Sequence, residues 1–493
     1  MPTQDSKRTY NGEILTTEIV VIGGGGGLAA AAAASEKGAK VILLEKRKKT
    51  GGNIALARGF LAAESPVQKR MKIDATREEL FKTAMNYAHW TINPRIIRAM
   101  IDRSGETIQW FEEMGVIFKD VPHSFYNQFP RIYHIPEGHG AKLVKVLLER
   151  CKSLGVQVLC ETSAKRILTG KKGEVTDVLA NRKDKEIKIN AKSVIIATGG
   201  YSGNRELLKK YYQHYTDGLR LYGLPSMGEG LHMATETGAA TEGLGTILAM
   251  GPLFEGSLYV HAVAMESNTV WVNRRGERFV NEAYEVPSET ANALNRQPDK
   301  ISYTLLDEEI KRSFIEEGLI KGIESRFPIT TRMTDLEKYL QKDVESRKVK
   351  ISRSWKEIAR WIGADYRVLK NTIDEYNSYC SKGCDDMFYK DRRFLQPLLT
   401  PPFYALKCCQ AFHGTIGGIK INHDMEVLDQ HESPIPGLYA AGNDTGGWVS
   451  DTYCYVLTGT ALAFALNSGR ITGENAAKYV SKNSFMARDK RCK

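Results

Sequence analysis

The sequence predicts an α/β protein in which a doubly wound sheet domain is interrupted by a second, inserted domain. Two apolar, strand-like runs, Glu18–Ile22 and Ser193–Ala197, are each followed closely by glycines, as strands in such sheets often are. The composition changes near Gly251, and from there to about Leu395 the chain is more charged and helical. With 493 residues the chain is also too long for one hydrophobic core. Two domains are therefore expected.

The first apolar run opens a strand–turn–helix–strand unit. Glu18–Ile22 is rich in β-branched residues, which suits a buried strand. Leu28–Lys37 contains a long run of alanine, a strong helix former, and Gly38 ends it. Val41–Leu44 is a second apolar run, and Glu45 follows it. A glycine turn here lets backbone N–H groups approach a pyrophosphate at the positive end of the helix, and the acid can accept hydrogen bonds from a ribose. The unit therefore predicts dinucleotide binding.

The glycine run Gly23–Gly27 does not fit the GxGxxG fingerprint directly, because counting from its first glycine places a leucine at the third glycine position. Counting back from the helix gives Gly27 and Gly24, with Ile22 at the first position. The distance from Gly27 to Glu45 is the usual one, so we adopt this assignment, in which the turn is one residue short. A glycine run can also form a flexible linker. Its position between an apolar strand and an alanine-rich helix favours a binding turn.

Further elements follow from periodicity and turn residues. We expect helices at Leu143–Leu154, Ala364–Cys380 and Leu457–Arg470, a strand at Val156–Cys160, a hairpin from Glu174–Ala180 and Lys185–Asn190, and strands within 415–429 and 435–444. The last two strands follow Pro401 and Pro402, so the sheet domain resumes there. The expected domains are residues 1–250 with 396–493, and the inserted residues 251–395.

Composition and charge exclude several classes of protein. Hydrophobic content of 42% and charged content of 26% are ordinary for a globular enzyme. The eight cysteines form no CxxCH motif and no paired CxxC motif, so reduced thiols and no metal site are expected. A net charge of +11 comes without any nucleic-acid-binding motif, which favours a solvated basic surface. The start has no apolar signal segment, and no run reaches membrane-span length, so we expect no transmembrane segment and a cytoplasmic location.

Several short segments, in this order, resemble one family of enzymes. The chain is similar to the flavoprotein subunit of fumarate reductase and succinate dehydrogenase, and to its relative 3-ketosteroid dehydrogenase. The resemblance runs from about residue 17 to 476 and is carried by VVIGGGGG…LLEK, TGGNIALARG, SVIIATGGY, SMGEGLHMA, VNRRGERFVNE, TPPFYALK, GTIGG and IPGLYAAGND. Most of these segments are weak signals alone, but together and in order they are specific.

The resemblance implies a glutathione-reductase-like, FAD-binding domain with an inserted α+β capping domain on the substrate side. It implies noncovalent FAD, with Glu45 at the adenosine ribose and the glycines near the pyrophosphate. Thr198 and Gly199 would lie on the adenine side, and Gly442, Asn443 and the helix start near Thr458 would reach the ribityl chain and flavin ring. The expected FAD-binding residues are Gly24, Gly27, Glu45, Lys46, Gly51, Gly52, Asn53, Ala164, Thr198, Gly199, Gly200, Gly442, Asn443, Thr458, Gly459 and Thr460.

The substrate side departs from the fumarate reductase pattern. Where that family has His-Pro-Thr, this chain reads Gly251-Pro252-Leu253, and Gly414 replaces a substrate-binding histidine. Segment 283–286 replaces an arginine, and SDTYCYVLTG replaces the family's Asn-Arg-Leu-Gly-Gly. Burying an unpaired carboxylate is costly, so fumarate is a poor candidate substrate.

The replacements favour the ketosteroid branch, whose tyrosine polarises a ketone oxygen. Tyr453, in SDTYCY, stands in that element, and a hydroxyl aimed at a developing enolate oxygen is sound chemistry. Val286 stands where the family has a second tyrosine, with Tyr284 two residues away, and His413 precedes the GT pair. Tyr453, Tyr284 and His413 are therefore the catalytic candidates. Tyr126, Tyr133, His134, His139 and Arg131 lie in a segment that the family uses on its substrate side, where packing is the more common role.

Three functions remain open. The first is an enone reductase or dehydrogenase acting on a 3-oxosteroid or bile-acid-like ketone. The second is a reductase of an unsaturated aryl carboxylate of the fumarate, urocanate or cinnamate type. The third is a flavin subunit that passes electrons within a complex. Each implies an external electron donor or acceptor, and none involves nucleic acid.

Overall fold

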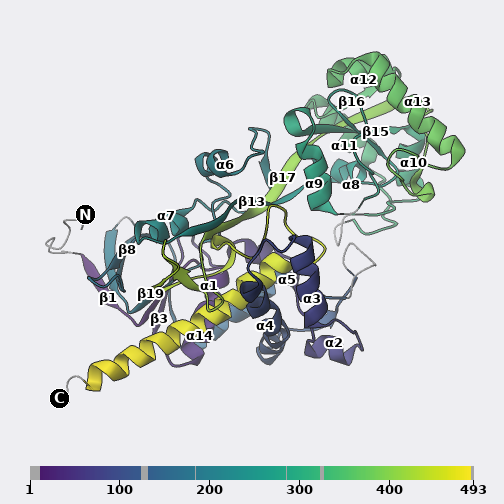
Figure 1. The fold of residues 1–493 in the computed structure, drawn as a ribbon. Coiled ribbons are helices and arrows are strands. Elements are labelled where there is room, and N and C mark those ends of the chain that lie inside the picture. The colour runs from purple at the N-terminus through teal and green to yellow at the C-terminus, as the bar shows by residue number, and fades with distance from the viewer. Residues whose placement is uncertain (1–11, 124–130, 184, 285, 323–326, 490–493) are drawn as a thin grey trace. The chain divides into compact units, whose positions relative to one another are not determined.

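The computed structural model describes residues 12–123, 131–183, 185–284, 286–322 and 327–489 (Figure 1). The chain divides into two compact units. The first contains Met1–Gln213, Gly223–Leu248 and Gly414–Lys493, and the second contains His214–Tyr222 and Ala249–His413. Both combine helices and strands, which confirms the α/β class.

The first unit is built on a mostly parallel six-stranded sheet. β2 (Ile19–Ile22), β3 (Val41–Leu44) and β11 (Ser193–Ile196) are buried along their whole length, as expected for strands covered on both faces. β2 lies between β3 and β11, so the strand order reverses beside it, and ligands of doubly wound sheets bind at such a point. The order is β18 (Glu426–Leu428), β19 (Pro434–Ala440), β11, β2, β3 and β7 (Gln157–Leu159), and only the edge strand β18 pairs antiparallel.

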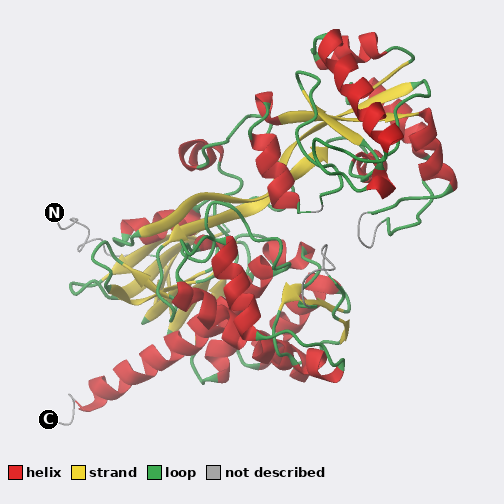
Figure 2. Ribbon diagram, turned by 45° about the vertical axis from the view of Figure 1, so that its right-hand side comes forward, coloured by secondary structure: helices red, strands yellow, loops and turns green. Residues whose placement is uncertain are grey.

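Two helices of the first unit, α1 (Gly26–Glu36) and α14 (Thr460–Asp489), pack side by side (Figure 1). Their contact is made by small residues, because a Cβ added to Gly469 would lie 2.6 Å from the Gly26 carbonyl oxygen. A Cβ on Gly473 would lie 2.2 Å from the Ala30 oxygen. Helix α14 was expected to end at Arg470 but continues as one run toward the C-terminus (Figure 2), since Gly473 serves interhelical packing and does not stop the helix.

Smaller elements complete the first unit. The expected hairpin is confirmed as β9 (Val175–Arg182) and β10 (Lys185–Asn190), which pair antiparallel within a four-stranded sheet. The helix expected at 143–154 is α5 (His139–Ser153), which begins four residues earlier and ends one residue earlier. The remaining strands are β1 (Glu13–Thr16), β8 (Thr162–Thr169), β4 (Phe60–Leu61), β6 (Tyr133–Pro136) and β5 (Phe118–Asp120). The remaining helices are η1 (Gly52–Leu56), α2 (Pro66–Arg70), α3 (Arg77–Tyr87), α4 (Pro94–Glu113), α6 (Arg205–Tyr211), α7 (Glu229–Glu236) and η4 (Gly442–Asp444).

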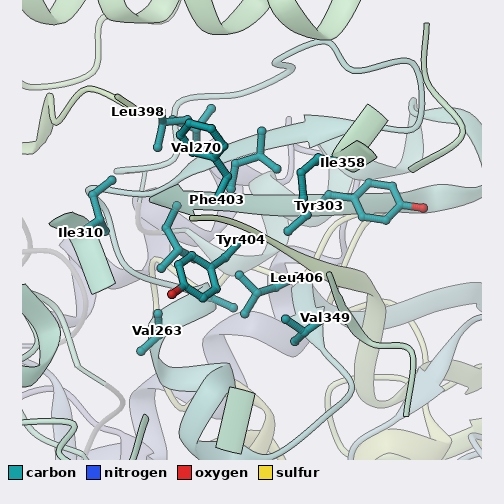
Figure 3. Close-up of a cluster of buried hydrophobic side chains, with 14 of the residues drawn as sticks. Val263, Val270, Tyr303, Ile310, Val349, Ile358, Leu398, Phe403, Tyr404 and Leu406 are labelled. Carbon is teal, nitrogen blue, oxygen red and sulfur yellow. The ribbon is translucent and has the colours of Figure 1, made fainter. Parts of the chain in front are cut away.

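The second unit has its own sheet and core. Val270, Ile310, Tyr404 and Leu406 are among the buried side chains that fill it (Figure 3). The strands are β12 (Arg220–Leu221), β14 (Val270–Asn273), β15 (Ile301–Asp307) and β16 (Val349–Ser352), with β13 (Thr241–Phe254) and β17 (Phe403–Ile419), which each run from one unit into the other. The helices are α8 (Leu258–Ala264), α9 (Pro287–Asn295), η2 (Pro298–Lys300), α10 (Glu308–Glu316), α11 (Leu336–Glu345), α12 (Trp355–Ile362), α13 (Tyr366–Lys382) and η3 (Arg392–Phe394).

The limits of the second unit differ from the expected 251–395. It extends to His413, because Phe403–Cys409 of β17 pairs with β15 in this unit's sheet. It also takes in the segment His214–Tyr222, whose strand β12 pairs with Ala411 and Phe412. These pairings are long-range and leave no mark in local composition. The role of this unit as a cap on the substrate side stays a prediction.

Candidate active site

The glycine turn after β2 is held by a buried acid. The Gly24 N–H donates to Glu45 Oε2 at 2.9 Å, and the Arg47 N–H donates to Glu45 Oε1 at 2.8 Å. The Gly51 N–H donates to the Gly24 carbonyl oxygen at 2.7 Å, which joins the turn to the next glycine pair. Glu45 is only 7% exposed. The acid at the end of β3 therefore organises two glycine segments that were both assigned to the cofactor.

The glycines of this turn have separate roles. Gly23 has φ +104°, and a Cβ there would lie 2.2 Å from the Ala197 carbonyl oxygen. A Cβ on Gly27 would lie 2.8 Å from Val21, so this glycine lets α1 pack against β2. By contrast, the nearest atom to a Cβ on Gly25 is 3.6 Å away, and a Cβ on Gly52 meets nothing within 4 Å. Gly25, which precedes α1, and Gly52 therefore have room beside them, which fits the pyrophosphate of a dinucleotide at the N-terminus of this helix.

Residues 224–229 connect the two glycine-rich strand ends of the first unit. Lys46 forms an ion pair with Glu229, and Asn53 exchanges two hydrogen bonds with the backbone of Leu224. On the other side the Gly228 N–H donates to the Gly200 carbonyl oxygen at 3.0 Å. Burial opposes ionisation of Glu229, but the hydrogen bond from Lys46 leaves the pKa of this carboxyl below its ordinary value. Lys46 and Asn53 are therefore engaged in joining loops around the expected cofactor site.

Asp444 is a buried acid that the sequence analysis did not single out. Its carboxylate accepts hydrogen bonds from the backbone N–H of Thr198, from the Thr198 hydroxyl at 2.9 Å, from Gly199 N–H at 2.9 Å and from Gly200 N–H at 2.8 Å. It thereby fixes the turn after β11, where both glycines have positive φ. An acid directly after AAGN, at the end of a parallel strand, is the signal that could have identified it.

The flavin-side segments also meet in the first unit. A Cβ on Gly414 would lie 3.5 Å from the Asn443 side-chain amide, so GTIGG and AAGND lie together. The Gly442 N–H donates to Ser468 Oγ of α14 at 3.0 Å. Ala164 is buried in β8. At the start of this strand the Thr162 N–H donates to the Glu45 carbonyl oxygen at 2.9 Å. The expected FAD residues of this unit therefore converge from distant parts of the chain, and their individual contacts to FAD stay predictions.

A group of tyrosines surrounds the start of α14. We call Tyr87, Tyr133, Tyr453 and Tyr455 the tyrosine cluster. The rings of Tyr453 and Tyr455 meet edge to face with centroids 4.7 Å apart, and the Tyr87 hydroxyl donates to the Tyr453 carbonyl oxygen at 3.4 Å. A Cβ on Gly459 would lie 2.9 Å from the Tyr133 ring, so this glycine permits the close approach.

Tyr453 is bound to the helix start. Its hydroxyl oxygen accepts the backbone N–H of Ala461 at 2.8 Å, and the Tyr453 side chain is 3% exposed. Burial is the largest cause that raises the pKa of this phenol, so it stays protonated at neutral pH. The hydroxyls of Thr458 and Thr460 are used within the same turn, donating to Tyr455 O and Leu457 O. Tyr453 thus presents a neutral donor at a helix N-terminus.

The other two catalytic candidates belong to the second unit. The Tyr284 side chain is 43% exposed, and burial together with a hydrogen bond to Glu289 raises the pKa of Tyr284 to about 12. His413 Nδ1 lies 3.0 Å from the Tyr222 carbonyl oxygen, and its ring meets the Tyr222 ring edge to face. Both therefore have local structural contacts, and their catalytic roles stay predictions.

Three candidates of the segment 126–139 have structural contacts. His134 is fully buried between Ser65 Oγ at 2.7 Å and the Ile132 carbonyl oxygen at 3.0 Å, and burial lowers the pKa of His134 to about 4. Arg131 is paired with Asp120 at 2.6 Å. His139 begins α5, with Nδ1 3.3 Å from the Arg58 carbonyl oxygen. Tyr126 lies outside the described residues.

Two features are absent from the residues that the structure describes. These residues contain no group of three or more His, Cys, Asp or Glu side chains placed to hold a metal ion. They also contain no helix that combines the length and the apolar character needed to cross a membrane.

Comparison with known proteins identifies the class. The profile of the FAD binding domain family matches residues 18–454. A vinyl phenol reductase of Lactiplantibacillus plantarum is 33% identical over 457 residues, which cover 89% of this chain and 91% of that protein. Fumarate reductase (cytochrome) of Shewanella frigidimarina is 30% identical over 439 residues, which cover 88% of this chain and 72% of that protein.

The fold is similar to that of a solved steroid enzyme. The structure of 3-ketosteroid Δ1-dehydrogenase from Sterolibacterium denitrificans, in complex with 1,4-androstadiene-3,17-dione, has a TM-score of 0.80 with 18% sequence identity. The match covers 94% of this chain and 99% of that one. It supports the glutathione-reductase-like fold and no more.

The chain belongs to the FAD binding domain family, within the fumarate reductase and succinate dehydrogenase flavoprotein superfamily. It is an FAD-dependent oxidoreductase that acts on carbon–carbon bonds of the CH–CH type. The room beside Gly25 and Gly52 at the N-terminus of α1 and the carboxylate of Glu45 fit this cofactor.

Proposed function

We propose that this enzyme exchanges hydride between FAD and a carbon–carbon double bond that is conjugated to an uncharged, oxygen-bearing group. A 3-oxosteroid or bile-acid-like enone and a vinylphenol both belong to this substrate class. The tyrosine cluster is the observation that carries the proposal, because it places the buried phenol of Tyr453 at the start of α14, edge to face with the ring of Tyr455. A phenol is a neutral hydrogen-bond donor and suits an uncharged oxygen. The similarity to a vinyl phenol reductase supports an uncharged substrate.

Bound FAD supplies the hydride chemistry, and the chain's residues place the substrate and stabilise charge. In an enone, hydride addition to the double bond puts negative charge on the carbonyl oxygen. The Tyr453 hydroxyl would donate to that oxygen. The Ala461 N–H already occupies the hydroxyl oxygen of Tyr453, so the phenolic proton is the group left for donation. The N-terminus of α14 adds a positive potential at the same place.

A second candidate is the reduction of an unsaturated carboxylate. The 30% identity to a fumarate reductase favours it, and so does one cation of the first unit. Arg58 is half-buried and stands two residues before β4, whose Leu61 N–H donates to the Gly459 carbonyl oxygen at 3.4 Å. A guanidinium at this place could pair with a carboxylate.

One experiment separates these functions. The photoreduced chain is mixed, without oxygen, with a 3-oxosteroid enone, 4-vinylphenol, fumarate, urocanate or cinnamate, and flavin reoxidation is followed. We expect fast reoxidation by an uncharged substrate. Reoxidation by the acids alone would favour the second candidate and reject the first.

The third function, electron transfer within a complex, has its own outcome in the same screen. A chain that exchanges electrons with a redox dye but is reoxidised by none of these alkenes would be an electron-transfer subunit. Such a result would also reject the proposal of an alkene substrate.

A further inference from the structure

The hydroxyl of Tyr455 is buried and has no hydrogen-bond partner in the part of the chain that the structure describes. The backbone of this residue is held firmly. Its N–H donates to the Tyr453 carbonyl oxygen at 3.0 Å, and its own carbonyl oxygen accepts the Thr458 hydroxyl at 2.9 Å. The ring packs edge-on against Tyr453 at an angle of 83°. The unpaired hydroxyl is therefore not the end of a loosely placed side chain.

The hydroxyls of two neighbouring tyrosines are used. Tyr453 accepts the Ala461 N–H at 2.8 Å, and Tyr87 donates to the Tyr453 carbonyl oxygen at 3.4 Å. Tyr455 is thus the member of this trio whose hydroxyl can both donate and accept without breaking a bond that the protein already makes.

An unpaired hydroxyl in a buried place is costly. A polar group that leaves water without a replacement partner destabilises the fold, and native proteins pair nearly all such groups. Phenylalanine would keep the same ring and avoid this cost. A protein tolerates the arrangement most readily where a ligand supplies the missing partner, and such exceptions concentrate at functional sites.

We propose that Tyr455 is a substrate-binding residue, whose hydroxyl forms a hydrogen bond with the uncharged oxygen of the substrate. This inference rests on the proposed function and adds a specificity element to it. Tyr453 and Tyr455 together offer two phenols to one neutral oxygen. A substrate carboxylate at the same place would meet phenols and no charge-neutralising partner from either residue, which disfavours it.

A flavin carbonyl oxygen is the other source of the same chemistry. It would accept the Tyr455 hydroxyl in the same way, without any substrate present. The experiment must therefore separate substrate binding from FAD binding, and it must do so without turnover.

The test compares holoenzyme variants Tyr455→Phe and Tyr453→Phe with the unchanged protein. The probes are saturated, so that no reduction can occur: 4-ethylphenol with 4-ethyltoluene, in which a methyl group replaces the hydroxyl, and a saturated 3-oxosteroid with its 3-deoxy counterpart. Binding is followed by the change in absorbance of the oxidised flavin. The oxygen-bearing probe that binds more tightly to the unchanged protein is used throughout.

In the unchanged protein this probe should bind at least tenfold more tightly than its partner, which lacks the hydrogen-bonding oxygen function. Tyr455→Phe should remove most of that difference, while FAD content and the unliganded flavin spectrum stay the same. The melting temperature of Tyr455→Phe should equal or exceed that of the unchanged protein, whereas Tyr453→Phe, which loses the Ala461 contact, should melt lower.

Two results would overturn the inference. One is an equal affinity for the two partners of the probe pair in the unchanged protein, or an unchanged preference in Tyr455→Phe. The other is a loss of FAD or a shifted flavin spectrum in Tyr455→Phe without probe, which would assign the hydroxyl to the flavin. Because binding is measured without reaction, the result does not depend on which double bond the enzyme reduces.

Discussion

The hydroxyl of Tyr453 takes part in two hydrogen bonds in the proposed mechanism. It accepts the Ala461 N–H in the free protein and would donate to the substrate oxygen during hydride transfer. Tyr453→Phe should therefore slow flavin reoxidation by the best substrate roughly 10²–10³-fold, the usual effect of losing one oxyanion donor. The lost Ala461 contact should also cost about 1 kcal/mol of stability. Stopped-flow reoxidation and thermal unfolding measure the two effects.

The outcome that contradicts this role is reoxidation of Tyr453→Phe at the unchanged rate. Tyr284 and His413 would then be the next candidates. FAD content should remain near that of the unchanged protein and serves as the control for correct folding.

A second residue, His134, makes stability depend on pH. Burial holds the pKa of His134 at about 4, below its ordinary value of 6.5. The folded protein therefore binds fewer protons than the unfolded chain between these values, and its stability falls as the pH falls from 6.5 toward 4. The contribution is at most about 1.4 kcal/mol per pH unit. His134→Gln should flatten the plot of melting temperature against pH in this window, and an unchanged slope would refute the assignment.

At the scale of elements, the contact between α1 and α14 holds the glycine turn in place. A Cβ on Gly473 would lie 2.2 Å from the Ala30 carbonyl oxygen, so the two helices would have to move apart. Gly473→Ala should destabilise the protein by about 1–3 kcal/mol, the usual range for overpacking. It should also weaken FAD binding, because α1 begins in the turn at Gly26. Lys478→Ala, at an exposed position of the same helix, is the matched control for both measurements.

Local patterns predicted some elements well, while long-range partners decided the others. β2, α1 and β3 followed from an apolar run, an alanine run and glycines that are close in sequence. The predicted end of α14 was wrong, because a glycine such as Gly473 resembles a helix stop until its packing partner Ala30 is known. Asp444 was missed because the backbone donors that it binds lie more than 240 residues away in sequence. Tyr455 was missed because an unpaired hydroxyl can be recognised only when the residues around it have been placed.

For the whole molecule, the division into two units has a consequence for the function. β13 and β17 each carry the chain from one unit to the other. Tyr453 and Tyr455 belong to the first unit, and Tyr284 and His413 belong to the second. The three catalytic candidates are therefore divided between the two units. The tyrosine pair of the first unit is the part of the proposed site that can be tested through local contacts alone.

FAD should stabilise the whole molecule, and it should be released from the protein without cleavage of a covalent bond. Its expected contacts come from four separated stretches of the first unit, around Gly24, Gly51, Thr198 and Gly442. A ligand that binds only the folded state stabilises it by about 2.7 kcal/mol at a free concentration of 100 Kd. Removal of FAD should therefore lower the melting temperature, and added FAD should restore it, whereas added FMN or NAD should not.

Acid precipitation tests the mode of attachment. The segments that resemble the family show no histidine in its flavin-linking context, so the flavin should be released into a yellow supernatant that chromatographs as FAD. Colour that stays in the pellet would show a covalent bond. Recovery of FMN instead of FAD would contradict the assignment of Glu45, since FMN has no adenosine ribose for that carboxylate to bind. Recovery of NAD would contradict the choice of FAD as the cofactor.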